Sequence, residues 1–141
     1  MTKINFGRVV LGGLIAGALL SIGDFLLHEP VLGEEWKATM ESYGMPEPGG
    51  AAITYFVIMD FIIGIALVWL YAAIRPRFGA GFRTAVVSGL IVWFFAWLTN
   101  LGGLVAMDIY PTNLLMLALV WGLFQMPLAA ILGAWFYKEG Q

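Results

Sequence analysis

The chain has 141 residues, of which 61% are hydrophobic and 11% are charged. A soluble domain of this length needs far more charge to cover its surface, so the apolar excess predicts a protein that faces lipid. The chain has no cysteine, which excludes a disulfide, a thiolate metal site and a redox pair. Its single histidine cannot build a multi-histidine metal site, and its net charge of -2 argues against a nucleic-acid partner.

The first apolar stretch imitates a secretory signal peptide. Lys3 and Arg8 precede it, as basic residues precede the apolar core of a signal. The stretch is long for such a core, however, and no small-x-small cleavage site follows it before the sequence continues as His28-Glu29-Pro30. We therefore expect a membrane span that is retained.

Four stretches are long and apolar enough to cross a bilayer, which takes about 20 residues for a hydrocarbon core of roughly 30 Å. They lie at about 6–28, 51–74, 84–107 and 113–137. Arg75-Pro76 is expected to stop the second helix, because the residue before a proline disfavours helix. Pro111 is expected to open the fourth. The sequence therefore predicts an all-α protein, a bundle of four transmembrane helices in a single domain over residues 1–141.

The basic residues predict the orientation of this bundle. One side of the four-span arrangement holds six of the seven, namely Lys3, Arg8, Arg75, Arg77, Arg83 and Lys138. The other side holds Lys37 and most of the acidic residues. We expect both termini on the cytoplasmic side of a cell inner (plasma) membrane. A soluble helical core is the alternative that the charge segregation disfavours.

The outer loop, residues 29–50, is the only long one. Leu32, Trp36, Met40 and Tyr43 recur within it at helical spacing, and Gly44 is suited to cap a helix C-terminus. We expect a short amphipathic helix on the outer membrane surface. An irregular loop with incidental spacing is the alternative.

Two hairpins of the chain look alike, which predicts a duplication. Aligning residues 13–15 on residues 89–91, both Gly-Leu-Ile, places Asp24 on Asn100. The second and fourth spans both end on Trp-x-Tyr before a basic residue. Repeated hairpins would be related by a pseudo-twofold axis along the membrane normal. Chance similarity of apolar helices and an ordinary aromatic belt explain the same strings equally well.

Each span carries a polar residue that is costly in lipid, at about 3 kcal/mol for a charge on insertion scales. These residues are Asp24, Asp60, Asn100 and Gln125, with His28 one turn beyond Asp24. We expect them to face inward as a polar cluster in the outer half of the bundle, with the amphipathic helix as a lid. Asp60 is expected to be protonated, wetted by a cavity, or paired with Asn100 or Gln125. Asp24 is expected to be solvated or hydrogen-bonded to His28.

Small residues predict the faces on which the helices pack. Gly13, Gly17 and Ser21 form a stripe on the first span that also delivers Asp24 and His28. Gly64 shares a face with Asp60 in the second span. In the fourth span, Gly122 and Gly133 share the face of Gln125.

Two strings resemble parts of small bacterial four-span membrane proteins that carry no assigned function. They are residues 67–79 (LVWLYAAIRPRFG) and 120–129 (VWGLFQMPLA). The resemblance covers nearly the whole chain. It implies a fold and a membrane location, and it implies neither an activity nor a site.

No motif of an enzyme is present. The sequence has no Gly-x-Ser-x-Gly, His-Glu-x-x-His or P-loop pattern, so we expect no catalytic residue, metal or cofactor. The first hypothesis is a non-enzymatic binding or accessory subunit, in the lipid bilayer, forming a homo-oligomer or joining other membrane subunits. The second is a small-solute or proton-coupled permease that uses the polar cluster. The third is a haem- or chlorin-binding subunit with His28 as the axial ligand.

Overall fold

The computed structural model describes residues 3–138, and its regular elements in that range are all helical. They are α1 (Phe6–Leu26), the π-helical turn η1 (Leu27–Val31), α2 (Gly33–Ser42), α3 (Gly50–Phe78), α4 (Phe82–Trp93), the π-helical turn η2 (Phe94–Leu98), α5 (Thr99–Ala106) and α6 (Thr112–Phe136). Four stretches are long and apolar enough to cross a membrane: Phe6–Val31, Gly50–Phe78, Phe82–Ala106 and Thr112–Phe136. The predicted all-α fold, with four long apolar helices and a short helix between the first two, is confirmed.

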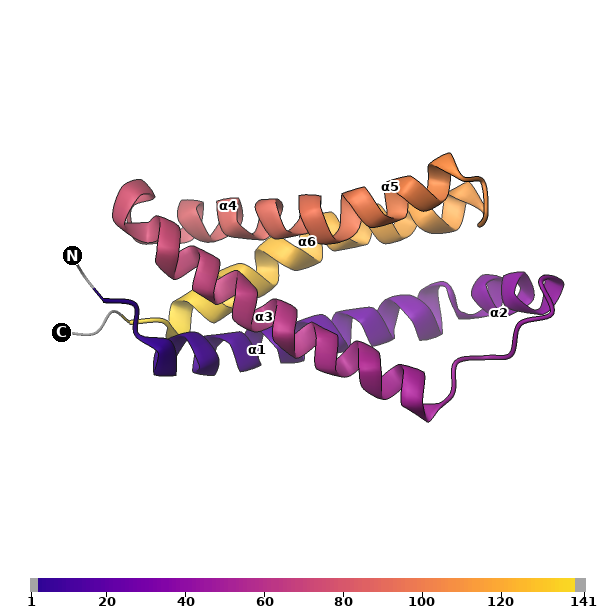
Figure 1. Ribbon diagram of the computed structural model, residues 1–141, viewed down its shortest axis with the longest axis horizontal. Coiled ribbons are helices and arrows are strands. Elements are labelled where there is room, and N and C mark those ends of the chain that lie inside the picture. The colour runs from indigo at the N-terminus through magenta and orange to yellow at the C-terminus, as the bar shows by residue number, and fades with distance from the viewer. Residues whose placement is uncertain (1–2, 139–141) are drawn as a thin grey trace.

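The long helices run from one end of the molecule to the other (Figure 1). Both termini and the turn between α3 and α4 lie at one end, called here the terminal end. α2 and the corner between α5 and α6 lie at the opposite end, called the α2 end. α1 packs most extensively on α3, α4 packs on α6, and α6 also crosses α1. The pairings α1 with α3 and α4 with α6 are those of the two predicted hairpins, and the duplication itself stays a prediction.

Pro76 does not act as predicted, and a second proline lies within a helical turn. α3 does not stop at Arg75-Pro76 but continues to Phe78, and it ends where Gly79 adopts a φ of 85°. A proline near a helix end removes one hydrogen bond without displacing the last turn, so the glycine decides where the helix ends. The first span likewise continues past His28 through η1, which contains Pro30. The wide turn closes with a bond of 2.8 Å from the Leu32 amide to the Leu27 carbonyl, since Pro30 offers no amide.

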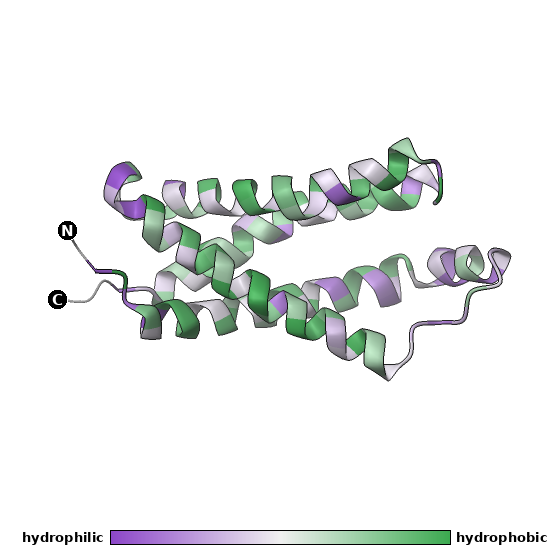
Figure 2. Ribbon diagram, viewed as in Figure 1, coloured by the Kyte–Doolittle hydropathy of each residue, from purple (hydrophilic) through white to green (hydrophobic). Residues whose placement is uncertain are grey.

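The core of the bundle lies toward the terminal end and is apolar. Leu20, Leu67, Val68 and Met126 are each fully buried there, beside a set of alanines on α1, α4 and α6. Figure 2 shows apolar residues along every long helix, with polar residues at the two ends and a few within α1, α3 and α5. The interior of the terminal half is therefore filled mainly by apolar side chains, with the small polar residues Thr84 and Ser88 also buried on α4.

α2 is docked at its own end of the bundle by aromatic contacts. Trp36 stacks on Tyr110 with ring centroids 5.5 Å apart, and the hydroxyl of Tyr43 donates to the carbonyl of Ile109. α2 ends as predicted at Gly44, which adopts a φ of 64°. The amides of Gly44 and Met45 bond back to the last turn, which is the Schellman arrangement. The loop after α1 thus holds a capped helix fixed to the corner between α5 and α6.

Candidate functional site

A hydrogen-bonded polar cluster lies inside the bundle where α1, α3 and α6 meet. The side chain of Gln125 on α6 donates from Nε2 to Oδ1 of Asp24 on α1, at 2.7 Å. Its Oε1 accepts a hydrogen bond of 2.7 Å from the indole of Trp121, one turn earlier. Gln125 is only 5% exposed. Its side-chain amide therefore joins α6 to α1, and both the nitrogen and the oxygen of the amide have a hydrogen-bond partner.

Asp60 brings the third helix into the cluster. It is 5% exposed, and its Oδ2 accepts a hydrogen bond of 3.0 Å from the hydroxyl of Ser21 on α1. The carboxyl groups of Asp24 and Asp60 also lie within interaction distance of each other. Of the three states expected for Asp60, pairing with Asn100 or Gln125 is not seen among the described residues, whereas protonation and wetting by a cavity stay predictions. Ser21 lies on the face of α1 that packs against α3, and its hydroxyl is therefore close enough to Asp60 to form this bond.

Glycines allow the helices to approach closely enough for these bonds. A Cβ on Gly13 would lie 2.5 Å from the Cα of Ile65, and a Cβ on Gly17 would lie 2.7 Å from the Cα of Phe61. A Cβ on Gly64 would overlap the backbone of Gly13 and Gly17. The stripe of small residues on α1, Gly13, Gly17 and Ser21, thus lets α3 pack closely and places Ser21 opposite Asp60.

The other predicted packing residues also lie at contacts. Gly122 lies against the indole ring of Trp97, and Gly133 lies against Val68. Sequence reasoning missed Gly23, where a Cβ would overlap the side-chain amide of Gln125. The bond from Gln125 to Asp24 therefore depends on a residue without a side chain at this position.

Two of the five predicted polar residues lie outside the cluster. Asn100 is exposed on the third span and makes no side-chain hydrogen bond within residues 3–138. It was expected to face inward, but α5 contributes no buried residue, because the helix packs mainly on η2 and α6 and leaves Asn100 on its exposed side. Although Asp24 and Asn100 align in the predicted repeat, their surroundings differ.

His28 is exposed at the α2 end. Its Nδ1 lies 2.9 Å from the backbone carbonyl oxygen of Asp24. Asp24 was expected to be solvated or hydrogen-bonded to His28, and among the described residues the bond is to the backbone and not to the carboxylate. Its ring packs edge-on against Trp36, with centroids 6.2 Å apart. The imidazole thus belongs to the aromatic contacts that dock α2, and the haem or chlorin hypothesis stays a prediction that rests on this residue alone.

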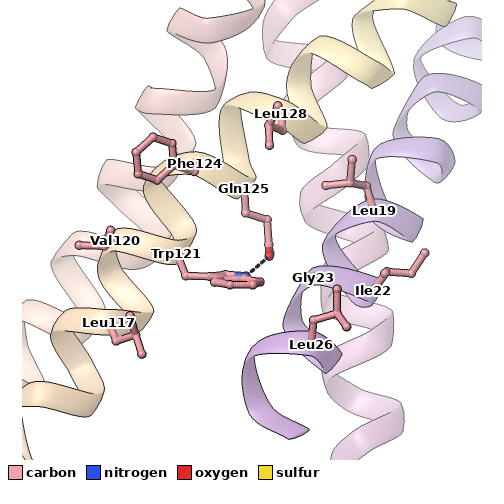
Figure 3. Close-up of a pocket in the computed structure, with 10 residues that line it drawn as sticks. All are labelled: Leu19, Ile22, Gly23, Leu26, Leu117, Val120, Trp121, Phe124, Gln125 and Leu128. Atoms are coloured by element: carbon pink, nitrogen blue, oxygen red, sulfur yellow. Dashed lines mark hydrogen bonds between the residues drawn. The ribbon is translucent and has the colours of Figure 1, made fainter. Parts of the chain in front are cut away.

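A groove runs between α1 and α6 beside the cluster (Figure 3). Its volume is about 480 Å³, and nine of its ten lining residues are apolar or glycine. The exception is Gln125, whose side chain points into the space between the helices together with Trp121. Such an apolar groove is compatible with the acyl chains of lipid.

Missed members of the cluster had a weak signal in the sequence. Trp121 lies four residues before Gln125, which is the spacing at which side chains meet on a helix. Ser21 was predicted only as a packing residue, although its hydroxyl is the partner of Asp60. A deep aspartate with a serine on the facing helix is a pairing that needs the register of the two helices, which the sequence does not supply.

The chemistry of the cluster is that of hydrogen bonding between carboxyl and amide groups. No group of three or more His, Asp or Glu residues suited to a metal ion occurs in the part of the chain that the structure describes. Neither Asp24 nor Asp60 has a basic nitrogen within 4.0 Å among residues 3–138, where the one salt bridge joins Lys37 to Glu47 on the surface. The cluster thus joins three helices and holds an acidic pair.

Comparison of the chain with protein-family models, with curated proteins and with solved structures found no match.

Proposed function

We propose that this chain is a non-enzymatic integral membrane protein that acts by assembling with other membrane-embedded chains, copies of itself included. One contrast supports the proposal most strongly. The polar groups of α1, α3 and α6 have hydrogen-bond partners inside the bundle, whereas Asn100 on α5 has none among residues 3–138. Polar side chains in transmembrane helices commonly form hydrogen bonds to a neighbouring helix. The unbonded side chain of Asn100 therefore favours the binding of a further helix to this side of α5.

The proposal includes an orientation. Six of the seven basic residues lie near the termini and around the turn between α3 and α4, which share one end of the molecule (Figure 1), and Lys37 lies on α2. The excess of positive charge at that end favours a cytoplasmic location for both termini in an inner membrane. α2, with its exposed acidic residues Glu34 and Glu35, would then lie outside.

Native mass spectrometry of the protein in polymer-bounded membrane discs tests the assembly. Extraction without detergent preserves contacts that form in lipid, so the spectrum should contain a mass above that of one chain, from a second copy or from a co-purified membrane protein. A spectrum with only the monomer, at an expression level near the natural one, would contradict the proposal.

A second candidate function is a proton-coupled or cation-coupled permease, and the acidic pair favours it. Asp24 and Asp60 lie close together and neither has a basic nitrogen within 4.0 Å among residues 3–138, which is unusual inside a membrane. Most residues buried between this pair and the terminal end are apolar, which argues against a continuous polar path.

Proteoliposomes containing the purified protein distinguish the two functions. A permease would carry protons or small cations across the vesicle wall, and Asp60→Asn would abolish the flux while the exposed Glu34→Gln variant would not. The assembly function predicts no flux above that of empty vesicles for any of the three proteins.

A further inference from the structure

α5 is the least covered part of the bundle. Buried residues make up 17% of the apolar stretch of the third span, against 33%, 33% and 44% in the first, second and fourth. α5 itself contributes no buried residue. An apolar helix surface that faces lipid needs no protein partner. A partner is indicated only where this face carries a polar group to which lipid cannot hydrogen-bond.

The side-chain amide of Asn100 is that feature. It lies six residues before Ala106, the end of the span. That is about 9 Å from the helix end, which keeps it inside a hydrocarbon core of roughly 30 Å centred on the span. The hydroxyl of the neighbouring Thr99 donates a hydrogen bond of 2.5 Å to the carbonyl of Phe95, one turn earlier in the same span. Among residues 3–138 the amide of Asn100 has no hydrogen-bond partner, and the hydrocarbon of lipid offers none.

The glycines beside Asn100 leave room for another helix. The glycines inside the other spans, such as Gly13, Gly64 and Gly133, lie against a neighbouring helix. A Cβ on Gly102 or on Gly103 would have no atom within 4 Å. Gly103 follows Asn100 by three residues and so shares its face. This face therefore combines an open amide with a small residue that permits close approach.

We propose that this face of α5 is a dimerisation surface, on which the Asn100 side chains of two copies of the chain hydrogen-bond to each other across a twofold axis along the membrane normal. The inference rests on the proposed assembly function and names its partner. An amide carries both a donor and an acceptor, so it is complementary to a second amide. Two copies with the same orientation place Asn100 at the same depth, whereas a different protein would need a polar group matched to that depth.

Energy transfer between donor- and acceptor-labelled copies in lipid vesicles, measured over a range of protein-to-lipid ratios, tests the contribution of Asn100. Asn100→Leu should weaken association about tenfold, which is the order measured for polar contacts between membrane helices. Asn100→Gln should restore most of it, because the amide is kept. Thr99→Val is the matched control, since its hydroxyl bonds within its own helix, and it should leave association unchanged.

Cross-linking tests the same face by geometry. Because the chain has no cysteine, a single introduced one is its only thiol. Met107→Cys lies seven residues after Asn100 on the same face and should form disulfide-linked dimers under a mild oxidant. Ile53→Cys, which is 57% exposed near the start of α3, is the control and should remain monomeric.

The outcomes separate this inference from the proposed function. If the wild-type chain associates and Asn100→Leu associates equally well, or if Ile53→Cys cross-links as readily as Met107→Cys, the surface is wrong and the assembly function stands. A wild-type chain that is monomeric in vesicles but co-purifies with a different membrane protein also overturns the dimer alone. A wild-type chain with neither kind of partner overturns both.

Discussion

Replacing Gln125 by leucine tests the role of the polar cluster in holding the helices together. The substitution removes two side-chain hydrogen bonds of 2.7 Å, one to Asp24 and one from Trp121. Polar contacts between membrane helices contribute about 0.6 kcal/mol on average and up to roughly 1.7 kcal/mol each. Bonds to a carboxylate lie toward the upper end. We expect Gln125→Leu to lower the free energy of unfolding by about 2 kcal/mol.

Reversible unfolding in mixed micelles of increasing sodium dodecyl sulfate measures this free energy. Phe124→Leu is the matched control, because Phe124 is the preceding residue on α6 and is 66% exposed. It should change the free energy by less than about 0.5 kcal/mol. A double-mutant cycle of Gln125→Leu with Trp121→Phe should give a coupling of about 1 kcal/mol. If Gln125→Leu is as stable as the wild type, the cluster does not hold α6 to α1.

Three further substitutions test the packing and the caps. Gly64→Ala should lower the free energy of unfolding by about 1–3 kcal/mol in the same micelle assay, because its Cβ overlaps the backbone of α1, whereas the open Gly102→Ala should be neutral. Gly44→Ala should cost about 1 kcal/mol at a φ of 64°, seen as faster hydrogen exchange in α2; unchanged exchange would contradict the cap. Trp36→Ala should release α2 and speed proteolysis of residues 43–49, whereas Glu34→Ala, at an exposed position of α2, should not.

The fold follows closely from the sequence because lipid imposes simple constraints on it. Length and hydropathy alone locate four spans, since every backbone group in a bilayer must be bonded within a helix. The small stripe of Gly13 and Gly17 correctly indicates the face that α3 covers. The ends of the helices are less predictable. Pro30 and Pro76 are accommodated within helical turns, because a π-type turn or a following glycine satisfies the local backbone.

The cluster is only partly predictable. A polar residue in a transmembrane span indicates that a hydrogen bond is needed, but the sequence does not identify the partner. Asp24, Asp60 and Gln125 converge, yet the partner of Asp60 is Ser21 and that of Gln125 includes Trp121. Which side chains meet depends on the crossing and register of three helices. Depth from the membrane surface, the quantity that the sequence does supply, is too coarse to choose among groups one turn apart.

Asn100 shows the limit of reasoning from depth alone. Its position in the outer half matches that of the other polar residues, so the sequence predicts that it joins them. In the structure it lies instead on the exposed surface of α5. A residue that fails to enter the cluster is then the best indication of a contact beyond the single chain.

Counting the copies in each assembly tests the central claim most directly. The protein is labelled with one fluorophore per chain, reconstituted in vesicles at a low protein-to-lipid ratio, and photobleached molecule by molecule. The account predicts that most wild-type spots bleach in two steps and that Asn100→Leu shifts them to one step. Single-step bleaching of the wild-type chain at every ratio, with no other protein co-purifying, would contradict it.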